Sequence, residues 1–106
     1  MVKKKIIKII KKYIEYLQND GIEVEKAVIF GSYAKNNYKK ESDIDVLIVS
    51  KSFGKNRVRE GQELFKQIRF VDSRIEPIPV SLKEYENSEN PFIEEIKKYG
   101  IEITSK

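Results

Sequence analysis

Cysteine and histidine are both absent from this chain of 106 residues. Without them the protein forms no disulfide bond and has neither a thiol nucleophile nor an imidazole base. The usual zinc sites are excluded as well, because they are built from cysteine and histidine ligands. Any chemistry must therefore use carboxylates, hydroxyl groups and lysines.

Long apolar runs are missing too. No apolar stretch approaches the ~20 residues that a membrane-spanning helix needs, and the longest run that matters is Val46 to Val49. The N-terminus is rich in lysine and carries no cleavage pattern of a signal peptide. We therefore expect no membrane association and a cytoplasmic location. A chain of this length has room for one hydrophobic core, so residues 1–106 are expected to form a single domain.

Acidic and basic residues nearly balance, except at the N-terminus. The formal net charge is +4, from 21 basic and 17 acidic residues. Six of the basic residues fall within the first twelve positions: Lys3, Lys4, Lys5, Lys8, Lys11 and Lys12. Such a cluster could neutralise nucleic-acid phosphates. It also lies opposite the apolar residues of a predicted helix, so a solvated helix face is the favoured interpretation and nucleic-acid binding is not expected.

Helix and strand patterns alternate in the first half of the chain, which favours an α/β (α+β) fold with a small mixed sheet. Val24–Phe30 and Asp43–Ser50 are predicted strands, and the second is apolar enough to be covered on both faces. Before them, an amphipathic helix that stops at Asn19–Gly21 is predicted from apolar residues spaced by three and four. These residues are Val2, Ile6, Ile10, Tyr13 and Leu17.

The second half continues the alternation. A helix is predicted over Asn56–Arg69, and a strand over Arg74–Val80. Pro77 and Pro79 lack N–H donors, so this strand is expected near an edge of the sheet. The residues expected to face the core from the helix are Val58, Leu64, Phe65 and Ile68.

Two short patterns predict the last helices. Ser81 with Glu84 three positions later is a capping box, in which the serine side chain caps a new helical turn. Pro91 favours a helix start and Gly100 a helix end, so a final helix is expected between them.

Gly31 and Ser32 directly follow the predicted strand that ends at Phe30. Glycine lets the backbone turn sharply and lets a phosphate approach closely, and the N–H groups that follow would attract an anion. Ser32 adds a hydroxyl donor and could cap a short helix that runs to about Asn36. On its own the pattern is weak, because a strand followed by Gly-Ser is usually a turn with a helix cap.

Asp43 and Asp45 are harder to explain by folding alone. Residues two apart in a strand point to the same face, about 6.5 Å apart. At an effective dielectric constant near 20, the two carboxylates repel each other by roughly 2 to 3 kcal/mol. A solvated strand end, with Ser42 and Asp43 in a turn, is the structural alternative. A Mg²⁺ ion would convert the repulsion into coordination, since it binds one or two carboxylates together with substrate phosphates.

The two patterns are more specific together than apart. Gly-Ser, ten residues and Asp-x-Asp should occur by chance on the order of once per thousand sequences of this length. The segment GSYAKNNYKKESDID resembles the signature of the minimal nucleotidyltransferases, within the DNA polymerase β-like superfamily. The resemblance covers essentially the whole chain, because the order of helix, strand, Gly-Ser turn and Asp-x-Asp strand is shared. It implies the nucleotidyltransferase fold.

The resemblance also implies an activity, the transfer of a nucleoside monophosphate, AMP from ATP, to a hydroxyl group by a two-metal mechanism. Gly31 and Ser32 would hold the β and γ phosphates, and Asp43 and Asp45 would bind two Mg²⁺ ions. Ser42 could donate to a phosphate or orient its neighbour. A third carboxylate, on a later strand, would help to bind the second metal and activate the attacking hydroxyl.

Glu76 is the preferred third carboxylate, because it lies among apolar residues in the only later strand-like run. Asp72 is the competitor, but it precedes that strand and is better explained as a turn cap. The chain departs from the family pattern in having glutamate here rather than the commoner aspartate. It also has Lys35-Asn36 where many members have Arg-Gly. A solvated lysine is the favoured interpretation of Lys35, with a phosphate role left open.

The acceptor is expected to belong to another protein, because a chain with one core has no room for an acceptor-binding domain. Minimal nucleotidyltransferases are similar to the antitoxins of two-gene modules whose partner is a helical HEPN toxin. The implied activity is transfer of AMP to a tyrosine of that toxin. An alternative is a catalytically silent, nucleotide-binding antitoxin that masks its partner by binding. A complete set of three carboxylates argues against this alternative.

Overall fold

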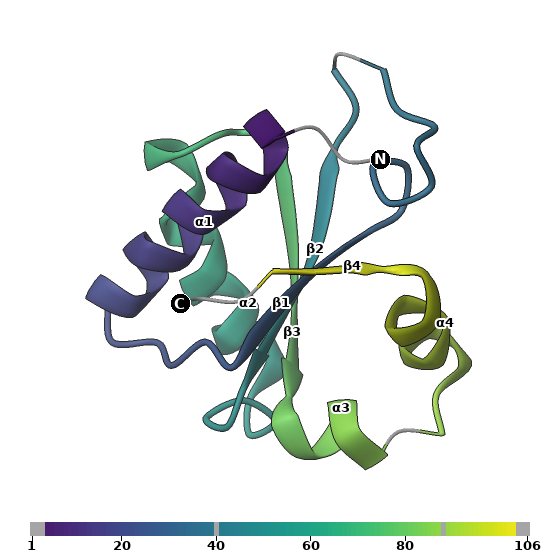
Figure 1. Ribbon diagram of the computed structural model, residues 1–106. Coiled ribbons are helices and arrows are strands. Elements are labelled where there is room, and N and C mark those ends of the chain that lie inside the picture. Colours follow the sequence, from purple (N-terminus) through teal and green to yellow (C-terminus); the bar gives the residue numbers. More distant parts are fainter. Residues whose placement is uncertain (1–3, 40, 88, 104–106) are drawn as a thin grey trace.

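The computed structural model describes residues 4–39, 41–87 and 89–103, which build one four-stranded sheet with helices on both faces (Figure 1). The strand order is β3-β2-β1-β4; β1 is antiparallel to both β2 and β4, whereas β2 and β3 are parallel. This arrangement confirms the expected α+β class with a small mixed sheet. The strands are β1 (Lys26–Phe30), β2 (Ile44–Ser50), β3 (Ile75–Ser81) and β4 (Ile101–Ile103).

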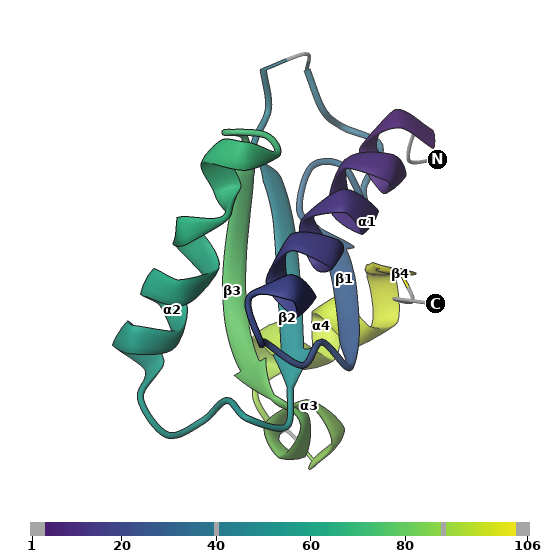
Figure 2. The same ribbon diagram turned by 90° about the vertical axis from the view of Figure 1, so that its left-hand side faces the viewer.

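The helices form two layers. Figures 1 and 2 show α1 and α2 on one face of the sheet and α3 and α4 on the other. A single turn of 3₁₀-helix, η1, follows α2 and leads toward β3. The elements are α1 (Lys4–Asn19), α2 (Arg57–Lys66), η1 (Ile68–Phe70), α3 (Leu82–Asn87) and α4 (Pro91–Tyr99).

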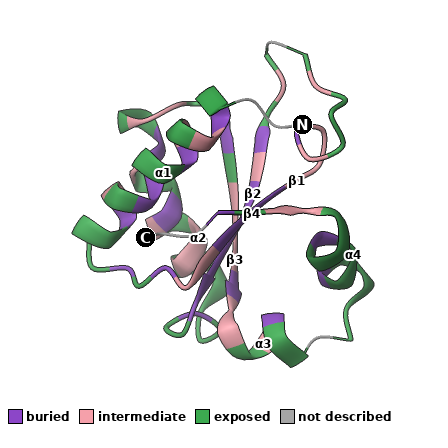
Figure 3. Ribbon diagram, viewed as in Figure 1, coloured by how far each residue is buried: buried purple, intermediate pink, exposed green. Residues whose placement is uncertain are grey.

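Each face of the sheet has its own hydrophobic core, and the alternation of side chains along β2 feeds both. Ile44, Val46 and Ile48 pack against α1 and the end of α2, while Leu47 and Val49 pack against α3 and α4. The central strand is therefore buried on both sides, as its nearly continuous apolar sequence predicted. Figure 3 shows the same pattern, with buried residues along the strands and exposed residues on the outer helix surfaces.

The prediction for α1 is confirmed. Its inward face consists of Ile6, Ile10, Tyr13, Ile14 and Leu17, all buried. The helix ends before Gly21, which has a φ of 86°, and the N–H of Ile22 closes the end by donating to the carbonyl of Leu17. Val2 and Lys3 lie outside the described residues, and the other five clustered lysines are exposed. None of the described helices is long and apolar enough to cross a membrane.

The prolines of β3 are explained by its position. Among the residues that the structure describes, β3 is at an edge of the sheet and pairs only with β2, so missing N–H groups can be tolerated on its open side. The predicted caps that follow are confirmed as well. The N–H of Glu84 donates to the Ser81 hydroxyl at 3.0 Å, and α4 begins at Pro91 and ends before Gly100.

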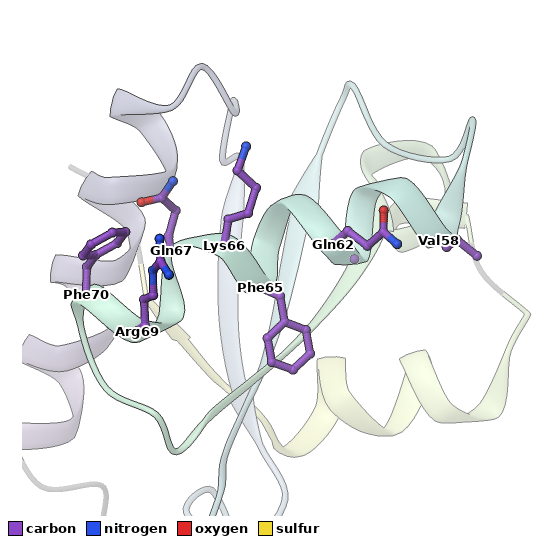
Figure 4. Close-up of a pocket in the computed structure, with 8 residues that line it drawn as sticks. Val58, Gln62, Phe65, Lys66, Gln67, Arg69 and Phe70 are labelled. Atoms are coloured by element: carbon purple, nitrogen blue, oxygen red, sulfur yellow. The ribbon is translucent and has the colours of Figure 1, made fainter.

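The helix predicted over Asn56–Arg69 is α2 followed by η1, and its predicted inward face is half wrong. Leu64 and Ile68 are buried, but Val58 and Phe65 are 72% and 62% exposed. Val58 and Phe65 are seven positions apart and share a helix face that points away from the sheet, because α2 covers only the edge strand. With Phe70 they line an open groove of about 750 Å³ on the outer side of α2 and η1 (Figure 4).

Candidate active site

The topology brings the Gly-Ser turn, the Asp-x-Asp pair and Glu76 to one edge of the sheet, the edge formed by strand ends. β1 ends, and β2 and β3 begin, at this edge. Phe30 pairs with Asp45 across β1 and β2, and Asp45 pairs with Glu76 across β2 and β3. Gly31 therefore leaves β1 beside the first residues of β2. The structure brings Gly31, Asp45 and Glu76 together although they are up to 45 positions apart in sequence.

Asp45 and Glu76 also share one face of the sheet. Their neighbours Ile44 and Ile75 point into the core under α1, so Asp45 and Glu76 point to the opposite face, the side of α3 and α4. Asp43, two positions before Asp45, extends from the same edge. Asp43 and Glu76 are exposed and Asp45 is partly buried, so the three carboxylates remain open to a ligand.

Gly31 is in direct contact with Asp45. Its φ of 72° lies in the left-handed region that favours glycine. A Cβ atom at this position would collide with the Oδ2 atom of Asp45 and lie 3.2 Å from its Cγ atom. Because Gly31 has no side chain, the Asp45 carboxylate can occupy the space beside it. The Gly-Ser turn and the Asp-x-Asp strand of the sequence signature are therefore packed against each other.

The carboxylates influence each other electrostatically. The pKa of Asp45 is raised, first by partial burial and then by the negative charges of Asp43 and Glu76. A bound cation would relieve this repulsion. The site is therefore set up for positive charge rather than for a structural ion pair.

The donor set fits an oxygen-binding cation such as Mg²⁺, because it consists of carboxylates only. Within the described ranges, no three Asp, Glu, His or Cys side chains are already grouped to hold a metal ion. Mg²⁺ commonly binds through one or two carboxylates and completes its shell with water and substrate phosphates. The arrangement thus fits a metal that arrives with a phosphate ligand.

Asp72, the competing third carboxylate, is occupied by Arg74. Its two oxygens accept hydrogen bonds from the backbone N–H of Arg74 at 2.9 Å and from Nε and Nη2 of the guanidinium at 3.0 and 2.8 Å. The Arg74 guanidinium holds the pKa of Asp72 below its ordinary value. Asp72 thus closes the turn before β3, as the turn-cap interpretation predicted, and this supports the preference for Glu76.

The substitution Asp72→Asn is expected to lower the free energy of unfolding at neutral pH by about 1–2 kcal/mol, since a charged, bidentate contact with Arg74 is replaced by a neutral one. A carboxyl group whose pKa is lowered by folding stabilises the folded state at pH values above its ordinary pKa of about 3.9. That stabilisation disappears as the pH falls through the folded value. The stability difference between wild type and Asp72→Asn should therefore shrink as the pH falls below about 4, which urea unfolding at several pH values would measure. A constant difference would contradict the assignment.

Arg74 is a positioning residue that the sequence reasoning missed. Besides its bonds to Asp72, Arg74 donates through Nη1 to the hydroxyl of Tyr33 at 3.3 Å, and its carbonyl accepts from the N–H of Ile44 at 2.8 Å. Tyr33 is buried and stacks on Tyr38, with ring centres 4.2 Å apart. Arg74 therefore links the Gly-Ser turn, the start of β2 and the start of β3.

The segment after Gly31 corrects one prediction. Residues 31–36 form a hydrogen-bonded turn and not the expected short helix from Ser32 to Asn36. The N–H of Lys35 donates to the Gly31 carbonyl, but that of Asn37 donates to Ser32, one residue further back than α-helical bonding requires. Asn36 has a φ of 57°, which ends any helix there.

The remaining residues of the signature are placed as follows. Ser32 is partly buried, and Lys35 is exposed, as a solvated lysine would be. The Ser42 hydroxyl accepts a hydrogen bond from the N–H of Lys39 at 2.8 Å, and so closes the loop that leads to Asp43. Glycine, a hydroxyl and three carboxylates at one open sheet edge form a site suited to a nucleoside triphosphate and its metal.

Comparison with known proteins identifies the family. Residues 5–103 match the nucleotidyltransferase domain family. A candidate protein adenylyltransferase of Methanocaldococcus jannaschii is 31% identical over 98 residues, which is 92% of this chain and 95% of that protein. A second one from the same organism is 44% identical over 43 residues, or 40% of this chain and 43% of its own. The chain belongs to the nucleotidyltransferase family.

Solved structures confirm the fold. A candidate nucleotidyltransferase of Sulfolobus solfataricus has a TM-score of 0.62 at 26% identity, covering 77% of this chain and 72% of its own. A toxin–antitoxin structure with AMP-PNP has a TM-score of 0.62 at 17% identity, covering 87% of this chain and 70% of its own. At that low identity, the second similarity concerns the fold alone. The predicted nucleotidyltransferase fold is thus confirmed.

Proposed function

We propose that this protein is an antitoxin that transfers AMP from ATP to a tyrosine of a helical HEPN toxin in the cytoplasm. The observation that carries the proposal is the position of Asp43, Asp45 and Glu76 at one open sheet edge beside Gly31. The comparisons support the choice of reaction and partner. Two similar proteins are candidate protein adenylyltransferases, and a toxin–antitoxin structure with AMP-PNP has the same fold.

In this proposal the β and γ phosphates of ATP lie against Gly31 and Ser32. Asp43, Asp45 and Glu76 would hold two Mg²⁺ ions, which neutralise the charge of the triphosphate when bound. The tyrosine oxygen forms a bond to the α-phosphorus while the bond from that phosphorus to the bridging oxygen breaks, and pyrophosphate leaves. Glu76 takes the proton of the hydroxyl.

The position of Glu76 suits an acceptor supplied by another protein. It is exposed on β3, which has no further strand beside it among the described residues. A separate protein can therefore approach Glu76 from the free side of β3. A buried base in the middle of the sheet would require the acceptor to enter the domain.

The proposal predicts a helical toxin encoded beside this chain, and it is tested with that protein, purified with the chain or added separately. Incubation with ATP and Mg²⁺ is expected to add the mass of AMP to that partner, at a tyrosine, as seen by intact mass and peptide mapping. A partner that binds the chain but gains no nucleotide would refute the transferase proposal.

The silent antitoxin is the second candidate, and the same materials distinguish it. It would bind ATP with Mg²⁺ in isothermal titration and would neutralise the toxin without changing its mass. The exposed third carboxylate, Glu76, argues against it, because binding of ATP with Mg²⁺ needs only one or two carboxylates.

A further inference from the structure

A small cavity of about 240 Å³ lies beside the Gly-Ser turn, between that turn and α4. One wall comes from the end of β1 and the turn, and the other comes from the face of α4 that carries Phe92 and Tyr99. No sequence motif pointed to this cavity. The residues used below are Phe30, Gly31, Lys35, Phe92, Glu95 and Tyr99, all of which line it.

The cavity is on the same face of the sheet as the carboxylates. Phe30 packs against the core under α4 and is paired with Asp45 in the neighbouring strand. Gly31 belongs both to the cavity wall and to the contact with Asp45. A ligand whose phosphates lie at Gly31 can therefore extend into the cavity without crossing the sheet. Figure 1 shows α4 on the same side of the sheet as the segment that follows β1.

The walls are suited to a flat ring. Phe92 and Tyr99 are 45% and 58% exposed, and their spacing of seven places them on one face of α4. Phe92 meets Phe30 edge to face, with ring centres 5.5 Å apart. Exposed aromatic side chains of this kind provide stacking surfaces for nucleobases.

The size of the cavity limits what it can hold. Sites that enclose a drug-sized ligand measure about 300–1,000 Å³, so 240 Å³ accommodates a ring system but not a whole nucleotide. The larger groove of 750 Å³ on α2 shares no residue with the turn or the carboxylates. A base in that groove could therefore not belong to a ligand whose phosphates lie at Gly31.

We propose that the cavity between the Gly-Ser turn and α4 holds the base of the nucleoside triphosphate. This inference rests on the proposed function, which places the phosphates at Gly31 and Ser32. Phe92 and Tyr99 stack on the base, and the Glu95 carboxylate accepts a hydrogen bond from an exocyclic amino group. Lys35 adds a positive charge between the base site and the phosphates. Adenine has the amino group that this wall would recognise.

The test compares ATP with inorganic triphosphate, which has the phosphates but no base. Isothermal titration with Mg²⁺ is carried out on wild type, Phe92→Ala and Tyr99→Ala. Both variants are expected to bind ATP about tenfold more weakly, as loss of one stacking partner predicts, and to bind triphosphate within twofold of wild type. Phe65→Ala, another exposed phenylalanine but in the α2 groove, should change neither affinity.

Each outcome of these titrations either supports or contradicts the base site. If the α4 variants bind ATP like wild type, or lose ATP and triphosphate equally, the base is not in this cavity while the phosphate site stands. If wild type binds neither ligand, both the base site and the proposed function fail. An aromatic side chain of the acceptor protein would be the occupant if the variants raised only the KM for that protein. Should Phe92→Ala not fold, Tyr99→Ala decides alone, since its side chain is the more exposed.

Discussion

Glutamine in place of Glu76 is expected to reduce AMP transfer at least a hundredfold, the range in which loss of a general base falls, while ATP still binds. Glutamine has nearly the same size but takes up no proton and gives a metal ion no negative charge. Because Glu76 is exposed at the start of an edge strand, the exchange disturbs no core packing. The Gly-Ser turn and both aspartates remain to hold the triphosphate.

Two measurements are needed, the transfer rate at saturating ATP and the affinity for ATP with Mg²⁺. Asp72→Asn is the matched control, because Asp72 precedes the same strand but has its carboxylate bound by Arg74. Its transfer rate is expected to stay within a few-fold of wild type at a temperature where it is folded. The reverse result, an inactive Asp72→Asn beside an active Glu76→Gln, would make Asp72 the third carboxylate.

The fold could be predicted from sequence where one pattern had one explanation. The β2 segment was recognisable because the unbroken apolar run from Val46 to Val49 places apolar residues on both faces of the strand. Pro77 and Pro79 similarly identified an edge strand. β4 was not predicted, because a strand of three residues carries no measurable periodicity.

α2 shows why burial on a helix is harder to predict than the helix itself. Leu64 and Phe65 are adjacent and both apolar, so the sequence does not decide which of them faces the sheet. The position of β3 at the edge of the sheet decides which residue is buried. α2 covers only this strand, so the helix face with Leu64 packs against it and the face with Phe65 stays exposed. Ser32 is a similar case: its capping propensity predicted a short helix, but the chain forms a turn there, because the left-handed Asn36 prevents a helix.

The candidate site was recognisable because Gly31, Ser32, Asp43 and Asp45 stand at fixed spacing within one segment. The contacts between segments were not recognisable. Arg74 joins Asp72, Tyr33 and the start of β2 only after the chain has folded. The contact of Gly31 with Asp45 likewise depends on the antiparallel pairing of Phe30 with Asp45, which no local pattern specifies.

The contact between Gly31 and Asp45 leads to the second prediction with a large effect. The variant Gly31→Ala is expected to be both less stable and inactive. Alanine at a φ of 72° costs about 1–2 kcal/mol in backbone strain. Its methyl group would also need the space that the Asp45 carboxylate fills, so either the turn or the aspartate must move. Movement of either separates the phosphate site from the metal ligands, and we expect transfer to fall by about a hundredfold or more.

Gly21→Ala is the control for strain alone. Gly21 has a φ of 86°, and a Cβ atom there would meet nothing within 4 Å. It should therefore lose stability only by the same backbone strain of about 1–2 kcal/mol and keep full transfer activity. Equal losses of stability in the two variants, measured by urea unfolding, would show that Asp45 does not restrict position 31.

A double-mutant cycle isolates the contact itself. In an Asp45→Ala background the carboxylate is gone, and the nearest remaining atom, the Cβ of residue 45, would be 3.4 Å from the new methyl group, an ordinary contact distance. Gly31→Ala should then cost only its backbone strain, so the two exchanges should be non-additive by about 1 kcal/mol or more. Since Asp45→Ala is itself inactive in our proposal, unfolding free energy is the quantity to measure. Additive losses would mean that the turn and the metal-binding strand are held together by something other than this contact.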